Sequence, residues 1–84
     1  MCSSLEKVVL PNSENYSIEG AVFQYCYSLK TIYSYSEKID NIVIDEKAFN
    51  DFNIDECVLF IPAGTRWAYK HHKGFGKFKK IEII

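Results

Sequence analysis

The chain has no long apolar run and no export signal. Nowhere does it contain the roughly 18 consecutive apolar residues that a membrane-spanning helix requires. Its start also lacks the basic segment and following apolar segment of a secretory signal peptide. We therefore expect no membrane insertion, and either a cytoplasmic protein or a piece of a longer exported chain.

Cysteine is scarce, and patterns typical of metal sites are missing. The three cysteines, Cys2, Cys26 and Cys57, form an odd number without a C-x-x-C pair, which argues against a disulfide framework and a zinc site. The adjacent His71 and His72 would point about 100° apart on a helix, too far to hold one ion together. We predict cysteines buried as small hydrophobic residues, no metal site and no cofactor.

The sequence also lacks a constellation for catalysis. A nucleophile needs a base within reach and a group that orients that base. Both histidines lie near the end of the chain, away from cysteines that we expect to be buried. Asp51, Asp55 and Glu56 stand in a loop-like, solvated stretch, so a carboxylate pair with tuned acidity is not expected. We predict that the protein is not an enzyme and has no catalytic residue.

Net charge is nearly absent, but charge is unevenly distributed. The formal net charge is −1, so the whole molecule has no electrostatic attraction to nucleic acid or an anionic membrane. Residues 1–63 hold ten acidic and four basic side chains, whereas residues 64–80 hold six basic residues, two histidines and no acid. This asymmetry indicates either a basic binding end or a solvated terminal face.

What the sequence does contain is enough apolar material for one small folded unit. Hydrophobic residues make up 48% and aromatic residues 15% of the 84 residues, well above the values of disordered chains. A chain of this length forms one domain at most.

Short phrases recur along the chain. Residues Cys2, Ser4, Leu5 and Val8 return 24 positions later as Cys26, Ser28, Leu29 and Ile32. Segment 18–23 returns 26 positions later as segment 44–49, and segment 8–11 is echoed by segment 59–62. Recurrence at this period is typical of stacked structural repeats, in which neighbouring coils share one core.

Alternation within the repeats indicates short strands. The aliphatic side chains expected to face the interior are those of Val8, Leu10, Ile32, Leu59 and Ile61. Pro11 and Pro62 are expected to end their strands, because proline has no N–H group to donate a hydrogen bond to a neighbouring strand. Phe23 and Phe49 would fill the interior from the opposite wall of each coil.

These motifs resemble the BspA-type leucine-rich repeat, a family of surface proteins of anaerobic gut and oral bacteria and of spirochaetes. The resemblance rests on C-x-S-L-x-x-[VI] followed by I-x-x-x-[AV]-F, and on the stretch from Cys57 to Lys70 with Gly74, Phe75, Phe78 and Ile81, which is similar to the segment closing such arrays. It implies a short leucine-rich-repeat-like solenoid of parallel β-strands with irregular turns and one short C-terminal helix, in an α/β, β-rich fold. Two to three coils would occupy residues 1–62 and a cap residues 63–84.

The closing segment is expected to form a lid over the last coil. Thr65 suits a helix N-cap and Gly74 a position just after the helix, which predicts a helix over residues 66–73. A last strand would follow over residues 80–84. The cap would place charge where an open stack would expose aliphatic side chains and strand edges.

The outward side chains of the strands form the predicted binding surface. Aligning the repeats places Val9, Tyr33 and Phe60 in one outer column and Lys7, Thr31 and Val58 in the next, and Tyr35 extends the surface. Tyrosine offers large contact area at low entropic cost, which favours recognition. The alternative is that these residues pack against flanking segments or a second copy. The candidate binding residues are Lys7, Val9, Thr31, Tyr33, Tyr35 and Phe60.

The resemblance implies a non-catalytic module of a cell-surface or secreted protein that binds a protein or host-surface ligand through the repeat sheet. The alternative is a purely structural C-terminal capping or assembly segment of a longer array. No N-terminal cap precedes Leu5 and Val8, so we also expect self-association through that end, with two copies related by a two-fold axis or by strand exchange.

Overall fold

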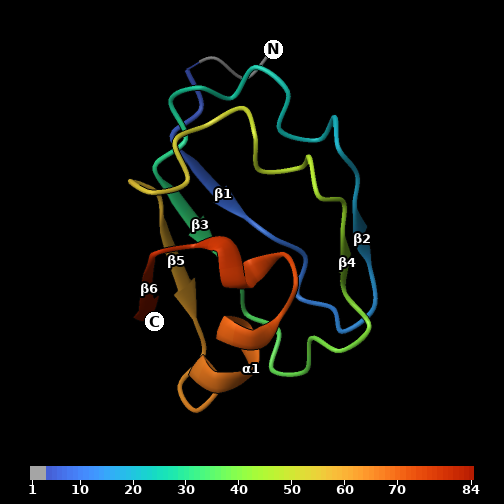
Figure 1. Ribbon diagram of the computed structural model, residues 1–84. Coiled ribbons are helices and arrows are strands. Elements are labelled where there is room, and N and C mark those ends of the chain that lie inside the picture. The colour runs from blue at the N-terminus through green and yellow to red at the C-terminus, as the bar shows by residue number, and fades with distance from the viewer. Residues whose placement is uncertain (1–3) are drawn as a thin grey trace.

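The chain alternates between two sheets, and the strands within each sheet are parallel. The computed structural model describes residues 4–84, so Cys2 of the first repeat lies outside the described residues. One sheet has the order β1-β3-β5-β6, and the other pairs β2 with β4 (Figure 1). The strands are β1 (Lys7–Val9), β2 (Ser17–Ile18), β3 (Thr31–Tyr33), β4 (Val43–Ile44), β5 (Val58–Ile61) and β6 (Lys80–Ile83). The predicted β-rich α/β fold with parallel strands and one short helix is confirmed.

The strand register follows the sequence repeats. Val8 of β1 lies beside Ile32 of β3, which in turn lies beside Leu59 of β5. In the second sheet Ile18 lies beside Ile44. The segments that recur after 24 and 26 residues are therefore hydrogen-bonded neighbours, one pair in each sheet. Segments 8–11 and 59–62 lie on β1 and β5, with β3 between them.

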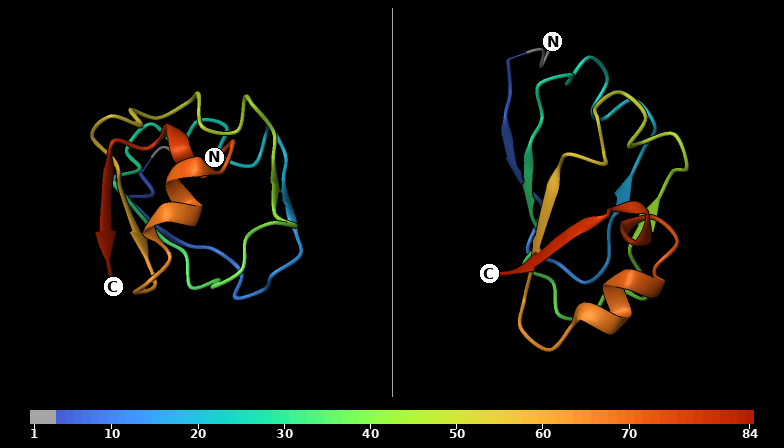
Figure 2. Two further views of the ribbon diagram at one scale, coloured as in Figure 1. Left: turned by 60° about the horizontal axis from the view of Figure 1, so that its bottom comes forward. Right: turned by 60° about the vertical axis from the view of Figure 1, so that its left-hand side comes forward.

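The core lies between the two sheets, and α1 overlies one end of it (Figure 2). Ile32, Leu59 and Ile61 are fully buried as predicted, while Val8 is half-buried at the edge. Four phenylalanine rings fill the interior on the side of the irregular turns: Phe23, Phe49, Phe52 and Phe78. Cys26 and Cys57 are fully buried, as predicted.

The closing segment contains α1 (Arg66–His71), a short 3-10 helix η1 (Phe75–Lys77) and β6. The helix is two residues shorter than predicted. Thr65 occupies the N-cap position, but its hydroxyl donates to the Pro62 carbonyl at 2.7 Å and makes no capping bond to the helix.

Gly74 also differs from its predicted role. Its φ of −89° is ordinary helical backbone, and so it is not a left-handed residue that ends a helix. Glycine is needed there for space, since a Cβ on Gly74 would lie 2.6 Å from the Cβ of Ile44. This close approach packs the closing segment directly against β4.

A polar cluster lies inside this otherwise apolar core. The Tyr69 hydroxyl donates to the Ser36 carbonyl at 2.6 Å and, having one proton, accepts the bond from the Ser34 hydroxyl at 2.7 Å. The Ser36 hydroxyl donates to the Ser13 carbonyl at 2.5 Å. The cluster therefore joins the closing helix to the turns that follow β1 and β3.

No helix within residues 4–84 is long and apolar enough to cross a membrane.

Candidate functional site

The outer face of the four-stranded sheet carries the predicted column. Val9, Tyr33 and Phe60 are register partners across β1, β3 and β5. The rings of Tyr33 and Phe60 are nearly parallel, with centroids 4.7 Å apart and planes 10° apart. Val9 is 57% exposed, and both rings are partly exposed. We call these three residues the outer column.

Two further side chains extend the outer column. The Tyr35 ring stacks beside the Tyr33 ring with centroids 6.3 Å apart, and Tyr35 is 42% exposed. The Lys7 ammonium lies 5.2 Å from the centroid of the Tyr33 ring, within the range of a cation–π interaction. Tyr33 is therefore contacted by three neighbours and is the centre of this surface.

The second predicted column lies beside the first. Lys7 and Thr31 are register partners, and Thr31 pairs in turn with the half-buried Val58. The structure thus brings all six candidate binding residues onto one continuous surface. Stacked rings that hold each other in place present apolar area with little side-chain freedom left to lose on binding.

The residues predicted for self-association lie at the edge of the sheet. Leu5 is 38% exposed, and Val8 packs partly against the core. The Glu6 carbonyl and the Leu10 amide bond to β3. Because successive peptide groups alternate in direction, those of Lys7 and Val9 point to the open edge.

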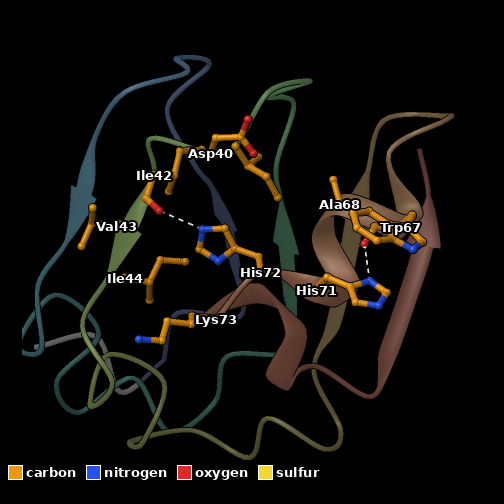
Figure 3. A pocket seen from close by; sticks show the side chains of 10 residues that line it. Asp40, Ile42, Val43, Ile44, Trp67, Ala68, His71, His72 and Lys73 are labelled. Carbon is orange, nitrogen blue, oxygen red and sulfur yellow. Dashed lines mark hydrogen bonds between the residues drawn. The ribbon is translucent and has the colours of Figure 1, made fainter.

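The structure also contains a groove that was not predicted from the sequence. A groove of about 580 Å³ runs between α1 and the segment that contains β4 (Figure 3). Its walls come from Ile42, Val43 and Ile44 on one side and from Trp67, Ala68 and His71 on the other. We call it the α1–β4 groove. The signal for it in the sequence was Trp67, which lies two positions from the buried Tyr69 and so faces away from the core.

The two adjacent histidines have separate roles. The Nδ1 of His72 accepts hydrogen bonds from the amides of Gly74 (3.0 Å) and Phe75 (3.3 Å), so its Nε2 carries the proton and donates to the Ile42 carbonyl at 2.8 Å. His71 donates from Nδ1 to the Trp67 carbonyl at 2.8 Å. Each ring is thus oriented by backbone groups. Within residues 4–84, no three His, Cys, Asp or Glu side chains are grouped to hold a metal ion.

Burial changes the acidity of several interior groups. It raises the pKa of Tyr16 to about 12 and that of the Cys57 thiol to about 11. Burial also raises the pKa of Tyr69, and the hydrogen bond from Ser34 offsets part of this effect. The Tyr16 hydroxyl has no hydrogen-bond partner of normal geometry, although Ser34 and Ser36 lie near it. All three groups are kept neutral in the core, away from both surface sites.

Comparison with protein-family models, curated proteins and solved structures gave no match to this chain. The resemblance to the BspA-type repeat therefore stays a prediction from its motifs, and function has to be argued from geometry.

Proposed function

We propose that the protein is a non-catalytic binding module, a short leucine-rich-repeat-like solenoid of a bacterial surface or secreted protein. It binds a protein or host-surface ligand through the outer face of the four-stranded sheet. The observation that carries this proposal is the register of Val9, Tyr33 and Phe60, which forms one column across three strands, with Val9 exposed and both rings partly exposed. The solenoid is supported by the parallel pairing of repeated segments in both sheets.

The composition of the outer face suits a protein ligand. Aromatic residues are enriched in protein interfaces, where large rigid rings fill pockets on the partner. Tyr33 lies at the centre, between Phe60 and Tyr35 and beneath the Lys7 ammonium. Truncating a central, supported ring removes the most contact area, so Tyr33 is the residue whose loss should weaken binding most.

One observation favours the second candidate, a capping or assembly segment. Tyr69 and Phe75 are fully buried at the end of the core, and β6 continues the sheet beyond β5. The closing segment thus covers one end of the core. In this case the outer face would have no ligand of its own.

Binding of the fluorescently labelled protein to cultured epithelial cells, measured by flow cytometry, separates the two candidates. We expect saturable binding that falls at least tenfold in Tyr33→Ala, equivalent to about 1.4 kcal/mol or more. The matched control is Val22→Ala, which removes an apolar side chain that is 52% exposed and lies outside both the outer face and the α1–β4 groove. Circular dichroism would verify that both variants fold.

The capping candidate is supported if the folded protein does not bind, or if Tyr33→Ala and Val22→Ala bind as well as the original chain. Equal losses in both variants would also contradict the proposal, because the outer face would then have no special role.

A further inference from the structure

A polar hollow lies beside the outer column, between the turns that follow β1 and β3. Its volume is about 520 Å³, and its lining comes from segments 12–14 and 35–37. Tyr35 borders the hollow and also stacks beside Tyr33, with ring planes 13° apart. The hollow is therefore continuous with the proposed binding surface, because one ring belongs to both. We call it the glutamate hollow, after Glu14 and Glu37 in its lining.

A buried serine holds the two turns of the hollow together. Ser36 is 2% exposed, and its hydroxyl donates to the Ser13 carbonyl at 2.5 Å. The Ser36 carbonyl accepts a hydrogen bond from the Tyr69 hydroxyl at 2.6 Å, which ties the same turn to α1. The positions of both turns are thus set before a ligand arrives, so binding has little backbone freedom to remove.

The two glutamates of the hollow have no positive partner in the described part of the chain. Both are exposed, and neither carboxylate takes part in an ion pair or hydrogen bond within residues 4–84. No lysine or arginine lines the hollow, although Lys38 follows Glu37 in the sequence. Residues 1–63 also carry ten acidic and only four basic side chains. The hollow is therefore negatively charged, and it favours a positively charged group on the partner.

Tyr35 determines which kind of cation fits this hollow. Tyr35 and Glu37 are both exposed and flank the buried Ser36, so their side chains leave the same side of the turn. A guanidinium group is planar, stacks on aromatic faces and pairs with a carboxylate through two parallel hydrogen bonds. An ammonium group is a compact and strongly hydrated charge, which makes less use of a neighbouring ring. A ring beside a carboxylate therefore favours arginine.

We propose that the glutamate hollow binds an arginine side chain of the protein ligand, stacked against Tyr35 and paired with Glu37. Glu14 adds negative charge from the facing turn. The ligand would then present apolar side chains to the outer column and an arginine beside them. This inference rests on the proposed function for the identity of the ligand, whereas the hollow itself can be tested with a small molecule.

The probe for the hollow is N-acetylarginine amide, titrated into the isotope-labelled chain and followed by NMR. We expect saturable shifts of the Ser36 and Glu37 amide signals, with a dissociation constant of about 10 mM. N-acetylcitrulline amide has nearly the same shape without the charge and should bind at least tenfold more weakly. Sodium chloride at about 0.5 M should weaken the arginine complex severalfold, because salt screens an exposed ion pair.

Variants show whether the arginine probe binds in the hollow. Glu37→Gln should weaken its binding severalfold, and the double variant Glu14→Gln/Glu37→Gln should abolish it. Glu46→Gln is the matched control, because it removes the same charge from an exposed glutamate that does not line the hollow. In the epithelial-cell assay, the double variant should bind severalfold more weakly than the original chain, and Glu46→Gln should bind equally well.

Equal binding of the arginine and citrulline probes would overturn the proposal, as would the absence of any saturable response to arginine. Unchanged arginine binding in the folded double variant would also overturn it. Cell binding that falls in Tyr33→Ala but not in the double variant would reject the hollow and leave the proposed function standing. If the original chain does not bind cells, the proposed function fails, while the arginine titration still decides whether the hollow binds a guanidinium group.

Discussion

Tyr16 and Tyr69 bring the same hydroxyl group into the same interior, but only Tyr69 is hydrogen-bonded there. The Tyr69 hydroxyl donates to the Ser36 carbonyl and accepts from Ser34, whereas the Tyr16 hydroxyl is buried without a partner. A buried unpaired hydroxyl costs about 1–3 kcal/mol. Tyr16 therefore carries an unfavourable contribution that the surrounding packing offsets.

The buried tyrosines predict a loss of stability in alkaline solution. The pKa of Tyr16 is raised from 10.0 to about 12 in the folded chain. A group whose pKa is raised by folding stabilises the native state fully below its unfolded pKa, and this contribution is lost as the pH rises through the folded pKa. We expect the free energy of unfolding to fall between about pH 10 and pH 12, by up to about 2–3 kcal/mol from Tyr16 alone. Urea denaturation at a series of pH values measures how the free energy of unfolding changes with pH.

Tyr16→Phe is the control for this prediction. Below pH 9 it should be as stable as the original chain or more stable, because the hydroxyl it removes is unpaired. Above pH 10 its stability should fall less steeply, with the remaining slope due to Cys57 and Tyr69. Superimposable pH curves for the two proteins would refute the role given to Tyr16.

At the scale of elements, His72 fastens the closing segment to the second sheet. Its ring joins the Ile42 carbonyl beside β4 to the amides of Gly74 and Phe75 at the start of η1. Gly74 in turn packs against the Ile44 side chain. The position of α1 relative to β4, and with it the shape of the α1–β4 groove, depends on this contact.

Removing the His72 ring should loosen that contact. We expect His72→Ala to lower the free energy of unfolding by about 1–3 kcal/mol, because it leaves buried backbone groups unpaired. His72→Asn keeps an acceptor near the Nδ1 position and His72→Gln a donor near the Nε2 position, so each should recover part of the loss. Thermal denaturation and hydrogen exchange at the Gly74 and Phe75 amides measure the effect.

The exposed neighbour His71 supplies the matched control. His71→Ala should change stability by less than about 0.5 kcal/mol. Equal destabilisation by the two alanine variants would mean that the hydrogen bonds of the His72 ring do not hold the closing segment against the second sheet.

The elements differ in how far the sequence predicts them. The matching residues of the repeats correctly align β1, β3 and β5, because equivalent aliphatic side chains such as Val8, Ile32 and Leu59 become register partners. The end of α1 was predicted two residues too late, since Gly74 suggested a left-handed stop but is required by the close approach of Ile44. Trp67 indicated an apolar surface on α1 that faces away from the core, but the opposite wall of the α1–β4 groove was not predictable, because it depends on long-range contacts such as the bond between His72 and Ile42.

At the scale of the whole molecule, β1 has a strand neighbour on one side only within the described residues. The outward peptide groups of Lys7 and Val9 and the exposed Leu5 side chain offer a second copy an edge to pair with. We expect concentration-dependent self-association, in which two β1 strands meet antiparallel across a two-fold axis. Light scattering in reducing buffer over a range of concentrations measures it.

Val9→Pro tests whether the open edge of β1 causes the self-association. Proline removes an outward-pointing amide without removing a bond to β3, so this variant should be monomeric. Val9→Thr keeps the amide and should still associate. A monomer at all concentrations for the original chain, or association of Val9→Pro, would contradict the prediction.

The parallel arrangement also determines how this molecule responds to tension. The four strands of the larger sheet point the same way, with β1 at one edge and β6 at the other (Figure 2). A pull on the start of β1 against the end of β6 runs along the strands, so the bonds between neighbouring strands are loaded in shear and share the force. Bonds at a hairpin end would instead break one at a time. The fold is thus built to resist stretching between its two ends.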